Sequence, residues 1–223
     1  MKHLLRALTT FSLVAVVAAC SADAGNADNA KTVSGATSTA AMSESVATVG
    51  HAAPDFSLMS AEGAKHSLSE FKGKYVVLEW VNYDCPFVKK QYGAGDMQKL
   101  QEKYGDKGVV WLSICSSAPG KQGNFEGAVL TDRIKSESSN ATAYLIDTDG
   151  TVGRMYGAKT TPHMFVVNPE GMLIYSGAID DKPSTNISDR PSMNYVAQAL
   201  DAAMAGKEIA VKATSSYGCG VKY

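Results

Sequence analysis

The chain has 223 residues, of which 45% are hydrophobic, and its formal net charge at pH 7 is -1. This length and composition are typical of one globular domain and exclude fibrous and wholly disordered proteins. Acidic and basic residues are interspersed, without the basic stripe that neutralises a phosphate backbone, so no nucleic acid is expected as a partner.

Residues 1–19 have the layout of a secretory signal peptide. Basic residues are followed by an uncharged apolar run over 7–19 that is too short to span a bilayer. The run ends in Val-Ala-Ala-Cys, which resembles the lipobox of bacterial lipoproteins, where the signal is cut before the cysteine and the cysteine is lipidated. The resemblance implies a lipid anchor on Cys20, and Ser21 implies sorting to the outer membrane. We therefore expect a bacterial cell-envelope protein, anchored to the membrane by lipid and facing the periplasm. The alternative is a simple secretory signal with Cys20 incidental.

Residues 20–48 are predicted to form a flexible linker after the lipidated cysteine. They are mostly small and polar and contain no aromatic residue, so they cannot bury enough apolar surface to offset chain entropy. We expect one folded domain over 49–223, including a C-terminal tail that carries a cysteine.

Hydrophobic patterns in this domain predict strands that alternate with helices. They alone indicate an α/β protein with a partly parallel sheet. The expected elements, in chain order, are a buried strand over 75–82, a helix that begins at Pro86, breaks at 93–95 and resumes at Asp96, a buried strand over 109–115, a helix over 122–135, a strand over 143–146, a hairpin of 164–167 and 172–175, and a last helix from about Pro191 to Ala205.

Cys85 lies directly after the first buried strand and directly before the helix that begins at Pro86. There its sulfur would face the free N–H groups and the positive end of the helix dipole, which favours the thiolate. Lys89 and Lys90 add positive charge one helical turn further on, whereas Asp84 opposes it. This position predicts a reactive nucleophile, and an inert buried cysteine is the alternative.

The segment EWVNYDCPFVK, residues 79–89, resembles the active-site strand and helix of thioredoxin-family proteins, and VGHAAPDFSL, residues 49–58, resembles the opening of redoxins and peroxiredoxins. Cys85 matches the first cysteine of the thioredoxin CxxC motif, but Val88 replaces the second, and the PxxxT pattern of peroxiredoxins is absent. The resemblance, over 49–223, implies a thioredoxin-like three-layer α/β/α sandwich with a central mixed sheet and a redoxin-type insertion.

The same resemblance implies roles for residues around the nucleophile. Glu79 matches the buried acid that relays protons in thioredoxins, and burial would raise its pKa towards the range useful for acid–base catalysis. A structural ion pair is the alternative. Thr161 and Pro162 match the cis-proline loop that faces the reactive Cys85, so with Pro86 they are expected to bind substrate.

Cys219 lies in the tail between Gly218 and Gly220. Flexible glycines suit a cysteine that reaches another thiol, so we predict a Cys85–Cys219 redox pair, with a free or intermolecular Cys219 as the alternative. Cys115 ends an apolar strand and is expected to behave as a small buried hydrophobe.

Together these features predict an extracytoplasmic thiol-disulfide oxidoreductase that uses Cys85, with protein or small-molecule disulfides as substrates and an unidentified thiol as electron donor. Reductase and oxidase directions both stay open. The alternatives are an antioxidant thiol peroxidase of the peroxiredoxin type and a non-catalytic lipoprotein that binds a peptide or a metal. No cofactor is expected. No metal is expected either, because copper chaperones of this fold use CxxxC and Lys89 takes the place of the second cysteine. His163, beside Pro162, is expected to be a hydrogen-bonded core histidine, and a residue that tunes or protonates the Cys85 thiol is the alternative.

Overall fold

The computed structural model of the protein describes residues 46–223. The predicted signal peptide, Cys20 and most of the predicted linker lie outside the described residues. Ala47, two residues before the predicted start of the domain at residue 49, already contacts it, because its N–H donates to the carbonyl of Met155 at 2.9 Å. Within 46–223, no helix is both long enough and apolar enough to cross a membrane.

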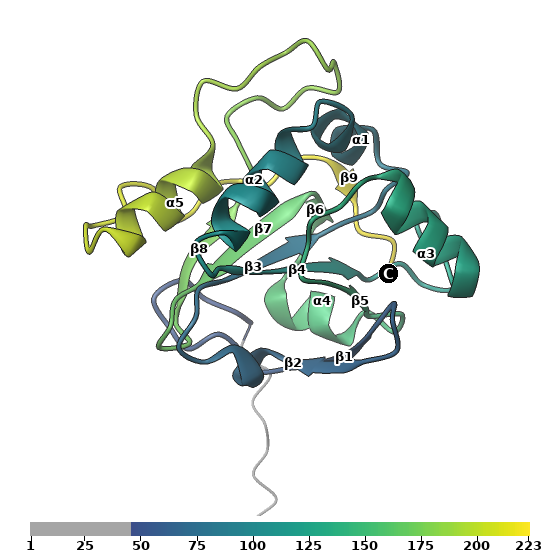
Figure 1. Ribbon diagram of the computed structural model, residues 1–223, viewed down its shortest axis with the longest axis horizontal. Helices are drawn as coiled ribbons and strands as arrows, with labels where there is room; N and C mark the ends of the chain where they lie inside the picture. Colours follow the sequence, from purple (N-terminus) through teal and green to yellow (C-terminus); the bar gives the residue numbers. More distant parts are fainter. Residues whose placement is uncertain (1–45) are drawn as a thin grey trace, which may run out of the picture. The chain divides into compact units, whose positions relative to one another are not determined.

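A seven-stranded mixed sheet forms the middle layer (Figure 1), in the order β2-β1-β5-β4-β3-β7-β8. β3 pairs in parallel with β4, and β4 with β5, whereas β7 runs antiparallel to β3. A second, two-stranded sheet joins β6 to β9. The strands are β1 (Ser57–Ser60), β2 (Lys65–Ser67), β3 (Val76–Trp80), β4 (Val110–Cys115), β5 (Ala143–Ile146), β6 (Thr160–Thr161), β7 (His163–Val167), β8 (Leu173–Gly177) and β9 (Cys219–Gly220).

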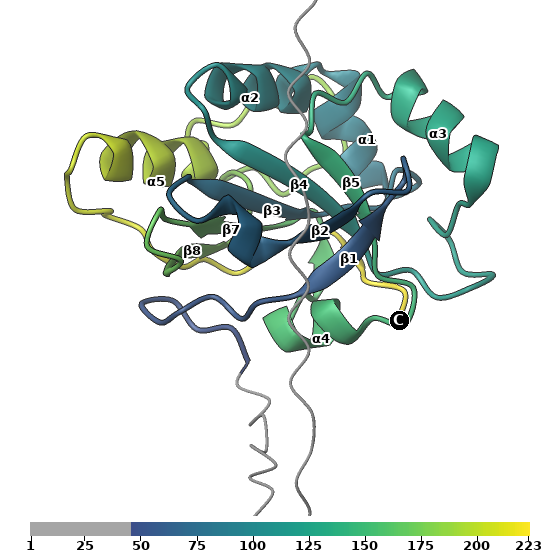
Figure 2. The same cartoon turned by 60° about the horizontal axis from the view of Figure 1, so that its bottom comes forward.

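Helices cover both faces of the sheet, as Figures 1 and 2 show. Four helices pack on one face, and α4 lies on the other with the short 3-10 helix η1. This is the predicted three-layer α/β/α sandwich. The helices are η1 (Leu68–Phe71), α1 (Pro86–Gly93), α2 (Asp96–Gly105), α3 (Gly127–Ser136), α4 (Thr151–Tyr156) and α5 (Tyr195–Met204).

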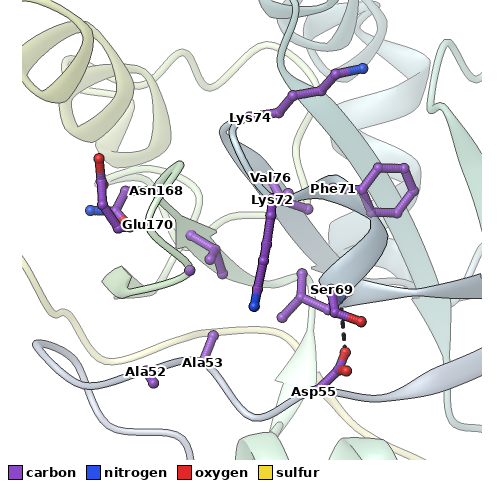
Figure 3. Close-up of a pocket in the computed structure, with 13 residues that line it drawn as sticks. Ala52, Ala53, Asp55, Ser69, Phe71, Lys72, Lys74, Val76, Asn168 and Glu170 are labelled. Carbon is purple, nitrogen blue, oxygen red and sulfur yellow. Dashed lines mark hydrogen bonds between the residues drawn. The ribbon is translucent and has the colours of Figure 1, made fainter.

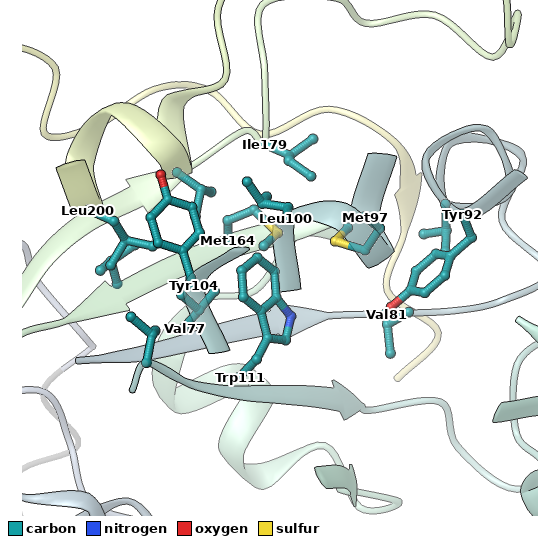
Figure 4. Packing of buried hydrophobic residues seen from close by; sticks show 14 of the residues in the cluster. Val77, Val81, Tyr92, Met97, Leu100, Tyr104, Trp111, Met164, Ile179 and Leu200 are labelled. Atoms are coloured by element: carbon teal, nitrogen blue, oxygen red, sulfur yellow. The ribbon is translucent and has the colours of Figure 1, made fainter. Parts of the chain in front are cut away.

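β3 divides the core because its side chains point alternately to the two faces. Val77 contributes to the cluster under α1, α2 and α5, shown in Figure 4, whereas Leu78 and Trp80 contribute to the cluster beside α4. Every residue of β3 is buried, as expected of a central strand covered on both faces. Glu79, on the same strand, is therefore carried into the interior.

Two predicted helix starts are wrong. α3 begins at Gly127 rather than at residue 122, because Gly123 has a φ of 89° and packs against the Asn82 side chain, which a helix could not accommodate. α5 begins at Tyr195 rather than near Pro191, because the Asn194 side chain caps it by accepting a hydrogen bond from the N–H of Ala197 at 2.8 Å. The strands β1, β2, β6 and β9 and the helix α4 were not predicted.

Candidate active site

Cys85 is the N-cap residue of α1, with Pro86 at the first helical position. Its side chain is 0% exposed, and its Sγ donates a hydrogen bond to the carbonyl oxygen of Thr161 at 3.0 Å. Pro86 itself is exposed. The sulfur thus lies at the N-terminus of a helix, as its place in the sequence predicts, but it is shielded from solvent.

The loop that faces Cys85 contains a cis peptide bond between Thr161 and Pro162. The Thr161 carbonyl is the group that accepts the hydrogen bond from the Cys85 thiol. The structure therefore brings the proline loop and the cysteine together, and the role of Thr161, Pro162 and Pro86 in binding substrate stays a prediction.

The C-terminal tail closes the site. β9 pairs antiparallel with β6, with Cys219 opposite Thr161 and Gly220 opposite Thr160, and Figure 1 shows the two strands side by side. The edge of Thr161 that an extended substrate would use is therefore occupied by the chain's own tail. The tail, rather than the core alone, covers Cys85.

Cys85 and Cys219, the predicted redox pair, are brought together at Thr161, because Cys85 donates to the Thr161 carbonyl and Cys219 lies opposite Thr161 in the β6–β9 pairing, and both are free thiols. Cys85 is buried and Cys219 is partly exposed. This arrangement joins the N-terminus of α1 to a residue more than a hundred positions later in the sequence. An intramolecular disulfide between them would therefore close a loop that contains most of the domain.

The environment of Cys85 favours its thiolate. Burial opposes ionisation, but the side chains of Cys219 and Thr161 and the N–H of Val88 lie where they can donate to the ionised sulfur, and together they lower the pKa of Cys85. The Thr161 carbonyl acts the other way, because it accepts from the neutral thiol. Among the described residues the buried Oγ1 of Thr161 has no hydrogen-bond partner. That hydroxyl is thus available to donate to the thiolate.

The environment of Cys219, in contrast, favours its neutral thiol. Burial and the neighbouring Cys85 raise the pKa of Cys219 to about 11. When one of the two sulfurs is ionised, it is therefore Cys85, and Cys219 keeps its proton.

Removing the Thr161 hydroxyl should reduce the Cys85 thiolate. Thr161→Val keeps the shape of the side chain, and a hydrogen bond to a charged group contributes about 1.5–3 kcal/mol, so alkylation of Cys85 near neutral pH should slow by about tenfold or more. Thr160→Val is the matched control, because the Thr160 hydroxyl donates to the Pro162 carbonyl at 3.1 Å. Equal pH profiles of alkylation for Thr161→Val and the wild type would contradict this assignment.

Glu79, on β3, is fully buried in the core. Its carboxylate accepts hydrogen bonds from four side chains, and none of the hydrogen bonds among the described residues joins it to a cysteine. Burial raises the pKa of Glu79 even though these donors oppose the shift. The donors are Trp111 Nε1 at 2.8 Å, Ser113 Oγ at 3.1 Å, Tyr92 OH at 3.2 Å and Gln101 Nε2 at 3.4 Å.

Glu79→Gln should make the fold more stable at alkaline pH. A raised carboxyl pKa means that folding favours the protonated form, so the stability from Glu79 is complete below its usual pKa of 4.5 and is lost as pH rises through the raised value. The free energy of unfolding of the variant should match that of the wild type below pH 4.5 and exceed it increasingly as the pH rises above that value. Urea unfolding across this range, with the exposed Glu62→Gln as control, measures the difference. A constant difference at all pH values would contradict the expectation.

His163 and Cys115 are buried residues with partners of their own. The Nδ1 of His163 accepts a hydrogen bond from the N–H of Lys159 at 3.2 Å, and burial, together with the Lys159 charge, lowers the pKa of His163 to about 4. The ring is therefore neutral at physiological pH. The Sγ of Cys115 lies 3.4 Å from the carbonyl of Gly123. Both match the roles expected from the sequence.

Sequence reasoning weighed Asp84 against Lys89 but missed two further sets of residues around the thiols, of which the first is Arg133. Arg133 of α3 lies 3.1 Å from the Asp84 carboxylate, and Lys89 lies 3.8 Å from it, so these cations offset the acid next to Cys85. The second set is the group of side chains that holds the tail, described below. No local pattern marks Arg133, because it reaches Asp84 only through the packing of α3.

The cavity in Figure 3, about 230 Å³ in volume, lies at the opposite end of β3 from Cys85. Val76, at the start of β3, and Lys72 line it, and the Lys72 side chain points into it. None of the cysteines described by the structure lines this cavity, so it is separate from the thiol site.

Comparisons with known proteins agree with this architecture. The AhpC/TSA family model matches residues 49–176. Thioredoxin-like protein YneN of Bacillus subtilis (strain 168) is 29% identical over 136 residues, which are 60% of this chain and 74% of that protein. Thiol-disulfide oxidoreductase ResA of Bacillus thuringiensis subsp. konkukian is 26% identical over 126 residues, which are 56% of this chain and 67% of that protein.

Two solved structures extend the likeness over most of the chain. An uncharacterized conserved protein from Geobacillus kaustophilus has a TM-score of 0.71 at 25% identity and covers 79% of this chain and 92% of its own. A hypothetical protein from Sinorhizobium meliloti 1021 has a TM-score of 0.68 at 26% identity, and the match covers 79% of this chain and 94% of that protein. The likenesses confirm the thioredoxin-like fold. The family match ends before the tail that carries Cys219.

Proposed function

Because the chain belongs to the AhpC/TSA family, a family of thiol redox proteins, we propose that it is a thiol-disulfide oxidoreductase whose redox centre is the pair Cys85 and Cys219. The observation that carries the proposal is the contact between the two thiols at the cis-proline loop, where the pKa of Cys85 is lowered and that of Cys219 is raised. One sulfur is prepared to attack, and the other holds a proton beside it.

The proposed reaction balances with these two residues. The Cys85 thiolate attacks one sulfur of a substrate disulfide, forms a mixed disulfide and releases the other substrate sulfur as a thiolate. That thiolate takes the proton of Cys219, which then attacks the Cys85 sulfur. The Cys85–Cys219 disulfide forms, the second substrate thiolate leaves, and two electrons have passed to the substrate.

The differences in exposure and in pKa between Cys85 and Cys219 favour one order of steps when an electron donor reduces their disulfide. A donor thiolate attacks the Cys219 sulfur of the disulfide, because Cys219 is the partly exposed member of the pair. Cys85 leaves as the thiolate, since a thiol of lower pKa is the better leaving group. A second donor thiol then releases Cys219 and completes the reduction.

Access to Cys85 requires the tail to move. Cys85 has no exposed surface, and β9 occupies the edge of Thr161. Displacement of β9 would expose the thiolate and at the same time free the backbone of Thr161 for an extended polypeptide. We propose that Thr161, Pro162 and the exposed Pro86 then contact the substrate.

The proposed role of Glu79 is to take up and release protons during the exchange reaction. A carboxyl with a raised pKa suits general acid–base catalysis near neutral pH. An exchange rate that is unchanged in Glu79→Gln across the pH range would remove Glu79 from the mechanism and leave it a structural role.

The location proposed for this activity is the bacterial cell envelope, with a lipid anchor on Cys20 after removal of residues 1–19. The sequence alone supports it. Labelled palmitate should enter the wild-type chain and not Cys20→Ser, and labelling of both or neither would contradict the anchor.

The family match favours a peroxidase as the second candidate. In that reaction the Cys85 thiolate attacks a peroxide, becomes a sulfenic acid as the alcohol or water leaves, and condenses with the Cys219 thiol to give a disulfide and water. Stopped-flow oxidation by hydrogen peroxide separates the candidates, because a rate no faster than that of a free thiol excludes the peroxidase.

The third candidate, which the sequence also left open, is a protein that binds a peptide or a metal without catalysis. The structure places no group of three or more His, Cys, Asp or Glu side chains for a metal within residues 46–223. A Cys85 that titrates like an ordinary thiol while a peptide still binds would favour this candidate.

The experiment that tests the proposed centre is a non-reducing peptide map of the full chain carrying Cys20→Ser, after oxidation by glutathione disulfide. We expect one Cys85–Cys219 link and an unmodified Cys115. A link from Cys85 to Cys115, or to a second chain, would overturn the proposal.

A further inference from the structure

Tyr217 joins the tail to the helix that carries Cys85. It precedes Cys219 by two residues, and its ring lies 5.8 Å from the ring of Phe87 in the first turn of α1. Its hydroxyl donates to the Asp180 carboxylate at 2.5 Å. Tyr217, two residues before the partly exposed Cys219, is thus tied to the helix whose N-terminus holds the buried Cys85.

Asp180 is a buried carboxylate that depends on its donors. It is 2% exposed and accepts hydrogen bonds from Tyr217 OH, from Gln91 Nε2 at 2.8 Å and from the N–H of Lys182 at 2.9 Å. Gln91 is buried in α1, and its Nε2 also lies 3.4 Å from the Tyr217 hydroxyl. A buried charge with a lost partner is strongly unfavourable, so the three side chains hold one arrangement.

Other anchors hold the tail at Thr214, whose N–H donates to the Ser176 carbonyl at 3.1 Å, and on the far side of Cys219. The N–H of Val221 donates to the Lys159 carbonyl at 3.1 Å, and the Tyr223 hydroxyl donates to the Ala158 carbonyl at 2.8 Å. Between Thr214 and Cys219, the side-chain hydrogen bonds of the tail among the described residues are those of Tyr217. Tyr217 therefore determines the approach of the tail to α1.

A buried polar network is a poor way to add stability, because apolar side chains of the same shape are often as good or better. Its advantage is that it specifies one geometry. Here the specified geometry is the position of Cys219 opposite Thr161, whose carbonyl accepts the hydrogen bond from the Cys85 thiol.

We propose that Asp180, Gln91 and Tyr217 form a clamp that positions Cys219 on Cys85 and holds the tail closed over the redox centre. The inference rests on the proposed Cys85–Cys219 chemistry and assigns the three as positioning residues for it. The clamp raises the effective concentration of Cys219 at Cys85, keeps Cys219 beside the thiolate and controls when substrate displaces β9.

Tyr217→Phe tests the clamp, because it removes only the hydroxyl and keeps the ring on Phe87. In the full chain carrying Cys20→Ser, the equilibrium constant for forming the Cys85–Cys219 disulfide against dithiothreitol should fall by about 10- to 100-fold. The pKa of Cys85, measured from thiolate absorbance, should rise. Asp180→Ala should lower the constant further, and Asp180→Asn, which keeps an acceptor oxygen, should recover part of it.

Tyr104→Phe is the matched control. It removes a hydroxyl that donates to the Ala197 carbonyl at 3.1 Å, so it should lower the melting temperature without changing the disulfide equilibrium. If the wild type forms no Cys85–Cys219 disulfide, the proposed function fails. If the wild type forms it, and both Tyr217→Phe and Asp180→Ala match its equilibrium constant and its Cys85 pKa, the clamp is overturned while the redox centre stands.

Discussion

Cys85→Ser is expected to slow disulfide exchange by about 10³-fold or more, because a serine hydroxyl is not ionised at neutral pH and cannot replace the thiolate as nucleophile. The reduction of a fluorescent glutathione disulfide by the full chain measures the rate. Cys115→Ala is the matched control, since Cys115 is a buried thiol whose partner is the Gly123 carbonyl, and it should leave the rate unchanged.

Cys219→Ser should separate the two steps of the reaction. Cys85 would still attack a substrate disulfide, but the mixed disulfide would persist because the second thiol is missing. Intact-mass analysis should therefore show one bound glutathione on Cys85. Exchange that continues at the wild-type rate in Cys85→Ser would contradict the assignment of the nucleophile, and rapid turnover in Cys219→Ser would contradict that of its partner.

Gly218→Ala is expected to disrupt the redox pair almost as strongly as loss of a cysteine. Gly218 has a φ of 134°, and a Cβ at this position would lie 2.1 Å from the Thr161 carbonyl oxygen. Strained backbone of this kind costs about 1–3 kcal/mol even without a clash. β9 must therefore move away from Thr161, and Cys219 moves with it, so the Cys85–Cys219 disulfide equilibrium should fall by about 100-fold or more.

Gly220→Ala is the control on the other side of Cys219. Its φ lies outside the left-handed region, and the nearest atom to a new Cβ is the Lys159 carbonyl oxygen at 4.0 Å. We expect Gly220→Ala to match the wild type in the dithiothreitol equilibrium. Equal behaviour of Gly218→Ala and Gly220→Ala would show that the pairing of β9 with β6 does not position Cys219.

The parts of the site that local sequence determines were predictable. The apolar run before Cys85 and the proline after it set a strand and a helix start, so the position of the sulfur at the N-terminus of α1 follows from adjacent residues. The break between α1 and α2 was predicted as well, and Gly95 adopts a left-handed φ of 71° there.

The parts of the site that depend on contacts between residues far apart in the sequence were not predictable. β6 and β9 have two residues each, too few for a periodic pattern, and they exist because Thr161 and Cys219 meet across the fold. Asp180 carries no local mark of its role, because Gln91 and Tyr217 reach it from α1 and the tail. For the same reason the sequence did not reveal that the tail pairs with the proline loop, where the resemblance implies that substrate binds.

The most direct test of the account is the stoichiometry of a single turnover. Excess reduced protein is mixed with a limiting substrate disulfide, quenched by acid and alkylation, and mapped without reduction. We predict one Cys85–Cys219 disulfide for each substrate disulfide reduced, with Cys115 alkylated throughout. Reduction of the substrate while Cys219 remains fully alkylated would contradict the claim that the two sulfurs act as one redox centre.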